Sequence, residues 1–302
     1  MRLHLITNPI AGSRHYSRLE ETLALLRRRG AEVVEFMTRG PDDCGRLVNI
    51  ILKDGASRIA IAGGDGTIRE VIEALSRARP DGDCPVGLVP AGTANVVAHE
   101  IGLTTDPDAV ASVLLSDDIA EIRPGLANDR LFVFSCGVGF DAQAVASVNP
   151  RLKAAIGPGA YVASALTRIV ARRPDRFTVT VGAADHTVES VIIAKARHYA
   201  GGYVLAGEAD MRDEAFQVCL FRYATRLHMA LFGAALIAGG ASRLSNATTL
   251  SATAVRIDGA DDQPVQLDGD IVTHLPCDVV PAPHTVPLLV PHAYLDRARP
   301  SP

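Results

Sequence analysis

The sequence predicts an α/β domain built on a parallel sheet, followed by a domain of antiparallel β-sheet. Through roughly the first 120 residues, short apolar runs alternate with stretches of helical periodicity, as in a parallel sheet with crossover helices. Beyond Arg123, strand-like runs follow one another with turn residues between them, as in an antiparallel sheet. The chain has 302 residues, of which 48% are hydrophobic, so it is long enough to bury two such cores.

The predicted elements of the first domain alternate along the chain. Its strands are predicted at residues 2–7, 32–37, 58–62 and 86–89. Its helices are predicted between and after them, at residues 17–29, 42–54, 68–78 and 94–101. Each helix would return the chain so that the next strand runs parallel to the one before it.

The predicted second domain consists mainly of strands, at residues 131–135, 176–181, 188–195, 215–221, 251–257 and 264–267. Two helical insertions are predicted at residues 154–172 and 225–239. The last segment, residues 285–302, is expected to return to the first sheet. We therefore expect one domain at residues 1–123, with 285–302 returning to it, and a second at residues 124–284.

Composition excludes several classes of protein. Charged residues make up 21% of the chain and the net charge is −4, without the basic excess that is typical of nucleic-acid-binding proteins. The five cysteines form no CxxC pair, as expected for reduced thiols in a cytoplasmic protein. The N-terminus lacks a signal-peptide pattern, and the longest apolar run is well short of the roughly 20 residues that span a bilayer. We expect a cytoplasmic protein that can still contact a membrane peripherally.

Glycine-rich turns follow three of the predicted parallel strands. The sequence GGDGT comes after the third strand, PAGTAN after the fourth and NPIAG after the first. Such turns lie together at the carboxyl edge of a parallel sheet, where ligands bind. Glycines let backbone N–H groups approach an anion closely, and a helix N-terminus adds a positive dipole, so the turns suit a phosphate. Their spacing matches neither the P-loop nor the Rossmann fingerprint.

Asp65 is the unexpected member of the GGDGT turn, because a carboxylate repels a phosphate. One interpretation is an ordinary glycine-rich turn in which Asp65 caps the following helix. The other is that a cation compensates its charge, and Mg²⁺ bound to a nucleotide would be such a cation. Thr67 could cap the helix or donate a hydrogen bond to a phosphate.

In their order along the chain, NPIAG, GGDGT and PAGTAN resemble the motifs of the diacylglycerol-kinase catalytic family of bacterial lipid kinases, within the NAD-kinase-like superfamily. Residues 137–142, residues 153–161 and the stretch QLDGD at residues 266–270 extend the resemblance over nearly the whole chain. The resemblance implies an α/β nucleotide-binding domain, a C-terminal antiparallel β-sandwich and a nucleotide site in the cleft between them. It implies that ATP and Mg²⁺ are used to phosphorylate a lipid hydroxyl at a membrane surface in phospholipid metabolism. A homodimer is a further implication.

Carried over residue by residue, the resemblance implies a set of nucleotide contacts. They are Asn8, Thr38, Gly63, Gly64, Asp65, Gly66, Thr67, Ile68, Arg69, Gly92, Thr93 and Asn95. Asp65 would face the phosphates and the metal, directly or through water. These residues would supply the positioning and charge neutralisation on which phosphoryl transfer depends.

The resemblance also implies a general base near the end of the chain. Asp270 matches the third residue of the family's DGE motif, where the family has Glu. Its side chain is one methylene shorter, so either its backbone lies closer to the acceptor or Asp268 shares the role. The structural alternative is a hairpin turn, because Asp-Gly is a strong turn signal.

A loop at residues 207–214 resembles the family's acidic loop, which holds a structural Mg²⁺. Asp213 matches the acidic ligand, whereas Gly207 replaces a proline and Glu214 replaces a glycine. The resemblance therefore implies a metal at Asp213, and an ordinary solvated acidic loop is the alternative.

The acceptor and two rival functions stay open at this point. Diacylglycerol is the usual acceptor of the family, but ceramide, sphingoid bases and phosphatidylglycerol are used by relatives. Val96 stands where many diacylglycerol-type members have Asp. An NAD kinase would share the GGDG turn, and a non-catalytic nucleotide-binding regulator would keep the fold without transferring phosphate.

Overall fold

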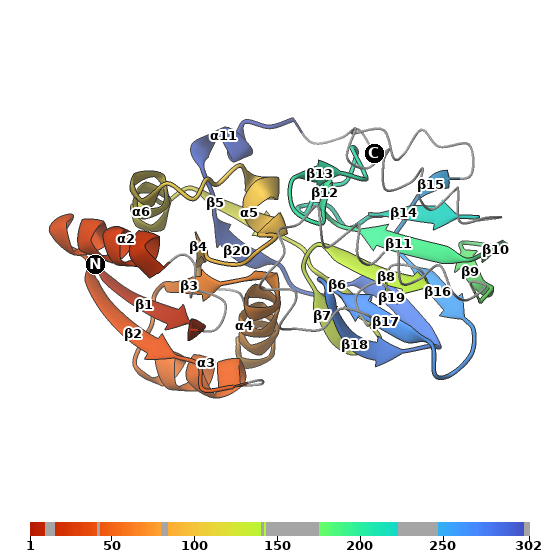
Figure 1. Cartoon of the computed structure of the whole chain (residues 1–302), viewed down its shortest axis with the longest axis horizontal. Helices are drawn as coiled ribbons and strands as arrows, with labels where there is room; N and C mark the ends of the chain where they lie inside the picture. Colours follow the sequence, from red (N-terminus) through yellow and green to blue (C-terminus); the bar gives the residue numbers. More distant parts are fainter. Residues whose placement is uncertain are drawn as a thin grey trace. The chain divides into compact units, whose positions relative to one another are not determined.

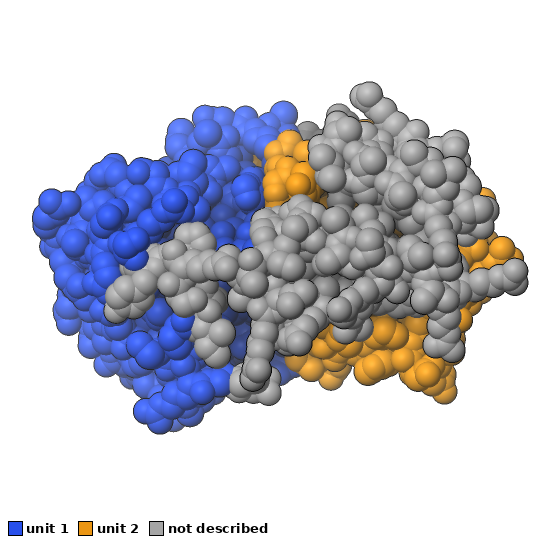
Figure 2. All heavy atoms as spheres, viewed as in Figure 1, with its two compact units in different colours: residues 1–123, 283–299 blue, residues 124–282, 300–302 orange. Residues whose placement is uncertain are grey.

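The computed structural model describes residues 1–9, 16–40, 43–79, 84–139, 142, 175–222 and 247–298. The chain divides into two compact units, which are coloured separately in Figure 2. Unit 1 is Met1–Arg123 with Pro283–Arg299, and unit 2 is Pro124–Ala282 with Pro300–Pro302. The two helices predicted at residues 154–172 and 225–239 lie outside the described residues.

Unit 1 is built on a six-stranded sheet in the order β2-β1-β3-β4-β20-β5 (Figure 1). Its strands are β1 (Arg2–Thr7), β2 (Glu32–Met37), β3 (Ile59–Gly63), β4 (Val86–Pro90), β5 (Ile119–Ile122) and β20 (Val286–Leu289). The first four run parallel to their neighbours, as predicted. The C-terminal strand β20 runs parallel to β4 and antiparallel to β5, so the end of the chain completes the first sheet.

Helices cover both faces of this sheet (Figure 1). On one face α2 (Tyr16–Arg28) packs against α6 (Pro107–Leu115), and on the other α3 (Asp43–Lys53) packs against α4 (Asp65–Ala78). Every residue of β3 and β4 is buried, as expected for strands that are covered on both faces. Two short helices, α5 (Val96–Ile101) and α11 (His292–Leu295), complete the unit.

Unit 2 is a sandwich of two antiparallel sheets, in the orders β10-β9-β16-β19-β6-β7 and β15-β14-β11-β8-β17-β18. The strands of the first sheet are β6 (Gly125–Ala127), β7 (Arg130–Phe132), β9 (Phe177–Val181), β10 (Ala184–Val188), β16 (Val255–Asp258) and β19 (Cys277–Pro281). Those of the second are β8 (Ser135–Gly139), β11 (Ser190–Ala194), β14 (Phe216–Phe221), β15 (Ala247–Ala252), β17 (Pro264–Leu267) and β18 (Asp270–His274), and a separate pair is β12 (His198–Tyr199) with β13 (Tyr203–Val204).

The core of unit 2 draws apolar side chains from both sheets. Val179 and Ile257 from the first sheet belong to the same buried cluster as Val138 and Val265 from the second. Side chains of two sheets that interdigitate in one core define a β-sandwich. The predicted fold class, an α/β domain followed by an antiparallel β-sandwich, is confirmed.

Two predicted strands of unit 2 have wrong bounds, because the chain changes sheets within them. The stretch 188–195 contains the end of β10 in one sheet and all of β11 in the other, with Glu189 at the crossing. The stretch 251–257 likewise joins the end of β15 to most of β16, in the opposite sheet. Both sheets bury apolar residues, so the apolar pattern continues through the crossing and the sequence shows no break.

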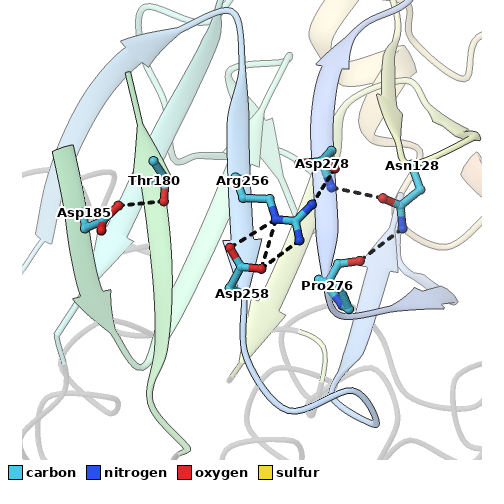
Figure 3. Close-up of polar contacts among 7 residues, drawn as sticks. All are labelled: Asn128, Thr180, Asp185, Arg256, Asp258, Pro276 and Asp278. Atoms are coloured by element: carbon cyan, nitrogen blue, oxygen red, sulfur yellow. Dashed lines mark hydrogen bonds and ion pairs between the residues drawn. The ribbon is translucent and has the colours of Figure 1, made fainter. Parts of the chain in front are cut away.

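The outer face of the first sandwich sheet carries polar side chains, which Figure 3 shows across β9, β10, β16 and β19. Arg256 lies between Asp258 and Asp278, at N–O distances of 2.9 and 2.7 Å, and these carboxylates raise the pKa of its guanidinium. Its neighbours along β16, Val255 and Ile257, are buried. This period of two identifies a sheet with one face in the core and one in solvent.

Candidate functional site

The carboxyl ends of β1, β3 and β4 meet at one edge of the sheet in unit 1. β2 lies on one side of β1 and β3 on the other, so the strand order reverses between β1 and β3. Ligands of open parallel sheets bind outside the carboxyl ends of the strands at such a point. The three predicted turns all begin at this edge, although residues 10–12 of the first turn lie outside the described part of the chain.

In chain order, the first turn is NPIAG, the second is GGDGT and the third is PAGTAN. The first and second turns are joined by their side chains. Asn8 Nδ2 donates a hydrogen bond to Thr67 Oγ1 at 3.0 Å, and the Asn8 backbone N–H donates to the carbonyl of Ala62 at 2.9 Å. The hydroxyl of Thr67 accepts in this bond, so its own proton can still be donated to a ligand. Asn8 therefore orients Thr67 at the start of α4.

The helix α4 begins without a side-chain cap. Its N-cap residue is Gly64, in an extended conformation with φ −92° and ψ −179°, and the first intrahelical bond runs from the N–H of Ile68 to the Gly64 carbonyl at 3.1 Å. The N–H groups of a first helical turn have no partner inside the helix, and here no N-cap side chain supplies one. The start of this 14-residue helix is therefore suited to an anion such as phosphate.

The second and third turns touch through their backbones. A Cβ atom on Gly92 would lie 2.5 Å from the Gly64 Cα and 2.8 Å from Asn95 Oδ1, so only glycine fits there. Asn95 has a left-handed backbone, with φ 48°, and its side chain accepts from the Gly92 N–H at 2.8 Å and donates to the Gly92 carbonyl at 3.0 Å. The third turn is thus held rigidly against the second.

Asp65 binds the start of a different helix. Its Oδ2 accepts from the backbone N–H of Val96 at 3.1 Å, and its Oδ1 accepts from that of Val97 at 3.3 Å. These are the first two residues of α5, so Asp65 caps a helix 31 residues away in the sequence and not the helix that follows it. Its carboxylate therefore holds the GGDGT and PAGTAN turns together.

The other predicted contacts take different positions at this edge. Thr93 is exposed in the third turn, and Gly66 is partly exposed in the second. Thr38 directly follows β2, where its N–H donates to the Thr7 carbonyl at 2.9 Å. Ile68 and Arg69 are buried in α4, and the guanidinium of Arg69 faces Glu73 four residues later.

Thr7 is a candidate that the sequence reasoning missed. It is the last residue of β1, is 8% exposed, and its Oγ1 has no hydrogen-bond partner among the described residues. Buried hydroxyl groups nearly always have a partner, so this oxygen fits a polar ligand at the sheet edge. The sequence did contain a signal for Thr7 as a site residue, because it is the last residue of a predicted parallel strand.

In unit 2, Asp268 has a structural role. It is 4% exposed and lies in the turn between β17 and β18, with φ 52°. Its carboxylate accepts three backbone N–H bonds, from Val133 at 2.6 Å, Phe134 at 2.9 Å and Ser135 at 3.0 Å. These bonds also explain why the strand predicted at residues 131–135 is wrong, because the chain bends between β7 and β8 to make them.

Asp270 differs from Asp268 in its surroundings. It is the first residue of β18, pairs with Leu267 across the turn, and is partly exposed. The Asp-Gly turn signal is therefore correct, since Asp268 and Gly269 both have positive φ and form the hairpin. The same turn leaves Asp270 as the more accessible of the two carboxylates.

Asp213 lies in the loop before β14 and is partly exposed. Its backbone carbonyl accepts a hydrogen bond from the ammonium group of Lys195. Within the described parts of the chain, no three His, Cys, Asp or Glu side chains are grouped so that they could hold a metal ion. Of the other motifs, residues 140, 141 and 153–161 lie outside those parts.

Among the described residues, no helix is both long and apolar enough to cross a bilayer.

Comparisons with known proteins identify both units. The family model "Diacylglycerol kinase catalytic domain" matches residues 2–127, and "YegS C-terminal NAD kinase beta sandwich-like domain" matches residues 135–290. A protein of Pseudomonas aeruginosa (strain UCBPP-PA14) named "Probable lipid kinase YegS-like" is 30% identical over 250 residues, which are 82% of this chain and 81% of that protein. A diacylglycerol kinase of Mycobacterium tuberculosis (strain ATCC 25618 / H37Rv) is 25% identical over 298 residues, 95% of this chain and 94% of that one.

Solved structures share the fold. A crystal structure of a diacylglycerol kinase from Bacillus anthracis str. Sterne has a TM-score of 0.72 at 15% identity and covers 97% of this chain and 98% of that chain. Another structure from the same organism has a TM-score of 0.80 at 17% identity over 97% of this chain and 96% of that chain. At these identities the likeness concerns the fold.

The two family matches place the chain among phosphotransferases whose second domain is an NAD-kinase-like β-sandwich. Within this class the chain belongs to the diacylglycerol-kinase catalytic family that carries the YegS-type C-terminal domain, and it is a lipid kinase.

Proposed function

We propose that this lipid kinase transfers the γ-phosphoryl group of ATP to a hydroxyl group of a membrane lipid. Diacylglycerol is the first candidate acceptor, and ceramide or a sphingoid lipid is the next. The observation that carries the proposal is the convergence of three turns where the strand order reverses, beside the uncapped start of α4. The name of the Mycobacterium tuberculosis relative supports diacylglycerol as the acceptor.

The nucleotide site of the proposal uses backbone more than side chains. The first-turn N–H groups of α4 bind phosphate oxygens, and Gly64 and Gly92 leave room for the phosphates to approach the backbone. Thr67, whose hydroxyl group is oriented by Asn8, donates a hydrogen bond to the nucleotide. When it is bound, MgATP supplies the phosphoryl group, and its metal offsets the phosphate charge.

Four further residues complete this site in the proposal. Thr38 and Thr93 bind the nucleotide through hydroxyl groups, whereas Ile68 and Arg69, whose side chains are buried, contribute through backbone position. Asp65 acts as a positioning residue, because its carboxylate fixes α5 and the third turn against the second.

Phosphoryl transfer to an alcohol needs a group that accepts the hydroxyl proton. We assign this role to Asp270, which is partly exposed at the start of β18. Asp268 is unsuited to this role, because its carboxylate is buried and already accepts hydrogen bonds from three backbone N–H groups. Because the acceptor is a lipid, we propose that the enzyme is cytoplasmic and contacts the membrane surface peripherally. The family resemblance adds the proposal of a homodimer.

The test is phosphoryl transfer from γ-labelled ATP and Mg²⁺ to a panel of detergent-dispersed lipids. The panel contains diacylglycerol, ceramide, sphingosine, monoacylglycerol and phosphatidylglycerol, with NAD as a soluble acceptor. Label in one lipid product supports the proposal and names the acceptor. Label in NAD alone contradicts it, and so does ATP binding without any labelled product. A matched control is Glu20→Gln, which neutralises an exposed carboxylate on α2 and should leave the rate unchanged.

A further inference from the structure

A partly buried loop joins β13 to β14 in unit 2. Residues 205–215 form no regular helix or strand, yet several of them, Leu205, Ala206, Ala209 and Met211, are at most 3% exposed. Leu205, Ala206 and Ala209 pack on the outer side of β11 and β14 in a cluster separate from the main sandwich core. Backbone carbonyl groups that such a loop shields from water need hydrogen-bond partners within the protein.

One such partner is a fully buried lysine. Lys195 follows β11 and has no exposed surface, and it is among the largest buried side chains of the chain. Its ammonium group donates to the carbonyl of Asp213 and, at 3.5 Å, to that of Ala215, and it lies 5.3 Å from the ring centroid of Phe216. Two carbonyl oxygens and an aromatic face are favourable neighbours for a cation.

One acidic group of the loop, the carboxylate of Asp210, is paired with an arginine of the same loop. Asp210 is buried and receives hydrogen bonds from the guanidinium group of Arg212, the shortest at 2.6 Å. Both oxygens of Asp210 take part in this bidentate pair, which is the strong form of such an interaction. Asp213 contributes its backbone carbonyl to Lys195, and its carboxylate is partly exposed.

These contacts do not fit the divalent ion that the family resemblance implies for this loop. Mg²⁺ and Ca²⁺ bind six or more oxygen ligands, mostly carboxylates, carbonyls and water. Here the carbonyls of Asp213 and Ala215 face an ammonium group, and a divalent ion on the same oxygens would lie next to a buried like charge. The described residues also offer no group of three acidic or other metal-binding side chains.

We propose that the Lys195 ammonium group takes the place of a divalent cation in this loop, so that unit 2 keeps its fold without a bound metal. The lysine is covalently tethered and always present, whereas a metal ion would have to be captured from solution. The proposal concerns the stability of unit 2 and does not depend on which lipid is phosphorylated.

The test is calorimetric unfolding of the full-length protein without nucleotide, in EDTA and then with excess Mg²⁺ or Ca²⁺. We expect the wild-type melting temperature to be the same within about 1 °C in all three conditions. The variant Lys195→Met, of similar volume but uncharged, leaves the partly buried carbonyl groups of Asp213 and Ala215 without this donor, and its melting temperature in EDTA should fall by roughly 5–10 °C. Either divalent ion should then raise the melting temperature of this variant and not that of the wild type.

Two further variants keep the proposal testable if Lys195→Met does not fold. Lys53→Met removes an exposed lysine at the end of α3 and should behave as the wild type. Asp213→Asn should also leave the melting temperature and its insensitivity to EDTA unchanged. The proposal is overturned if the wild-type melting temperature falls in EDTA and recovers with Mg²⁺. If Asp213→Asn then removes this dependence on Mg²⁺, a metal ion bound at Asp213 is the correct interpretation. A stoichiometric divalent ion in purified protein, measured by mass spectrometry of the elements, would also overturn it.

Discussion

The substitution Asp268→Asn tests the division of roles between the two carboxylates of the DGD stretch. Asn is nearly the same size as Asp and tolerates the left-handed backbone at this position, where φ is 52°. The change therefore leaves the turn intact and alters only the interactions of the side-chain head group. We expect a large loss of stability, because this carboxylate is a structural acceptor.

The magnitude follows from the three hydrogen bonds. The carboxylate accepts from the N–H groups of Val133, Phe134 and Ser135, and one of its oxygens serves two of them. The Asn carbonyl can keep those two bonds in weaker, neutral form, but its NH₂ group meets the third N–H as a second donor. Hydrogen bonds to charged groups contribute about 1.5–3 kcal/mol each, so we expect a loss of about 2–4 kcal/mol. At about 2–4 °C per kcal/mol, the melting temperature should fall by roughly 5–15 °C.

The assay is thermal and urea unfolding of the wild type and three variants. The exposed turn residue changed in Asp262→Asn is a matched control in the same unit and should alter stability by less than about 0.5 kcal/mol. The variant Asp270→Asn should be nearly as stable as the control and lose turnover. If Asp268→Asn instead keeps its melting temperature while losing turnover, the assignment of the two carboxylates is wrong.

Three further predictions concern unit 1. Gly92→Ala places a methyl group 2.5 Å from the Gly64 Cα, so nucleotide affinity in calorimetric titration should fall at least about tenfold, and unchanged affinity would refute the contact. Burial raises the pKa of Cys44 to about 12, so alkylation at pH 8, followed by peptide mass spectrometry, should be far slower than for a free thiol, and an equal rate would contradict this. The hydrogen bond to Asp118 raises the pKa of His292, so the contact between them stabilises the fold fully below about pH 6.5 and loses this effect as pH rises through the raised pKa. The advantage of the wild type over His292→Gln in urea unfolding should therefore shrink toward pH 9. An advantage that does not change with pH would count against the contact.

The sequence predicted the parallel sheet well because its signals are local. Each of β1 to β4 is a short run rich in apolar residues, and each ends in a turn that contains glycine or asparagine. The start of α4 was predicted at Ile68, three residues late, because the glycines of GGDGT hide the first helical turn. In unit 2 the apolar pattern did not show where the chain crosses from one sheet to the other, as at Glu189.

The roles of individual site residues were harder to predict, because they depend on contacts that are distant in sequence. Asp65 binds the start of a helix 31 residues later, and Asp268 binds N–H groups more than 130 residues earlier. Lys195 looked like the end of a strand, and nothing local indicated that it is buried against the Asp213 loop. Residue type and spacing located the candidate site, whereas the tertiary structure shows which carboxylates are engaged by the backbone.

The most direct test of the proposed function is the rate of label transfer from γ-labelled ATP to lipid, measured for the wild type and Asp270→Asn side by side. The account predicts a labelled lipid with the wild type and a rate at least about a hundredfold lower with the variant, at unchanged ATP affinity and melting temperature. A wild type that binds ATP but labels no lipid would contradict the proposed reaction. Equal rates for the two proteins would contradict the role assigned to Asp270.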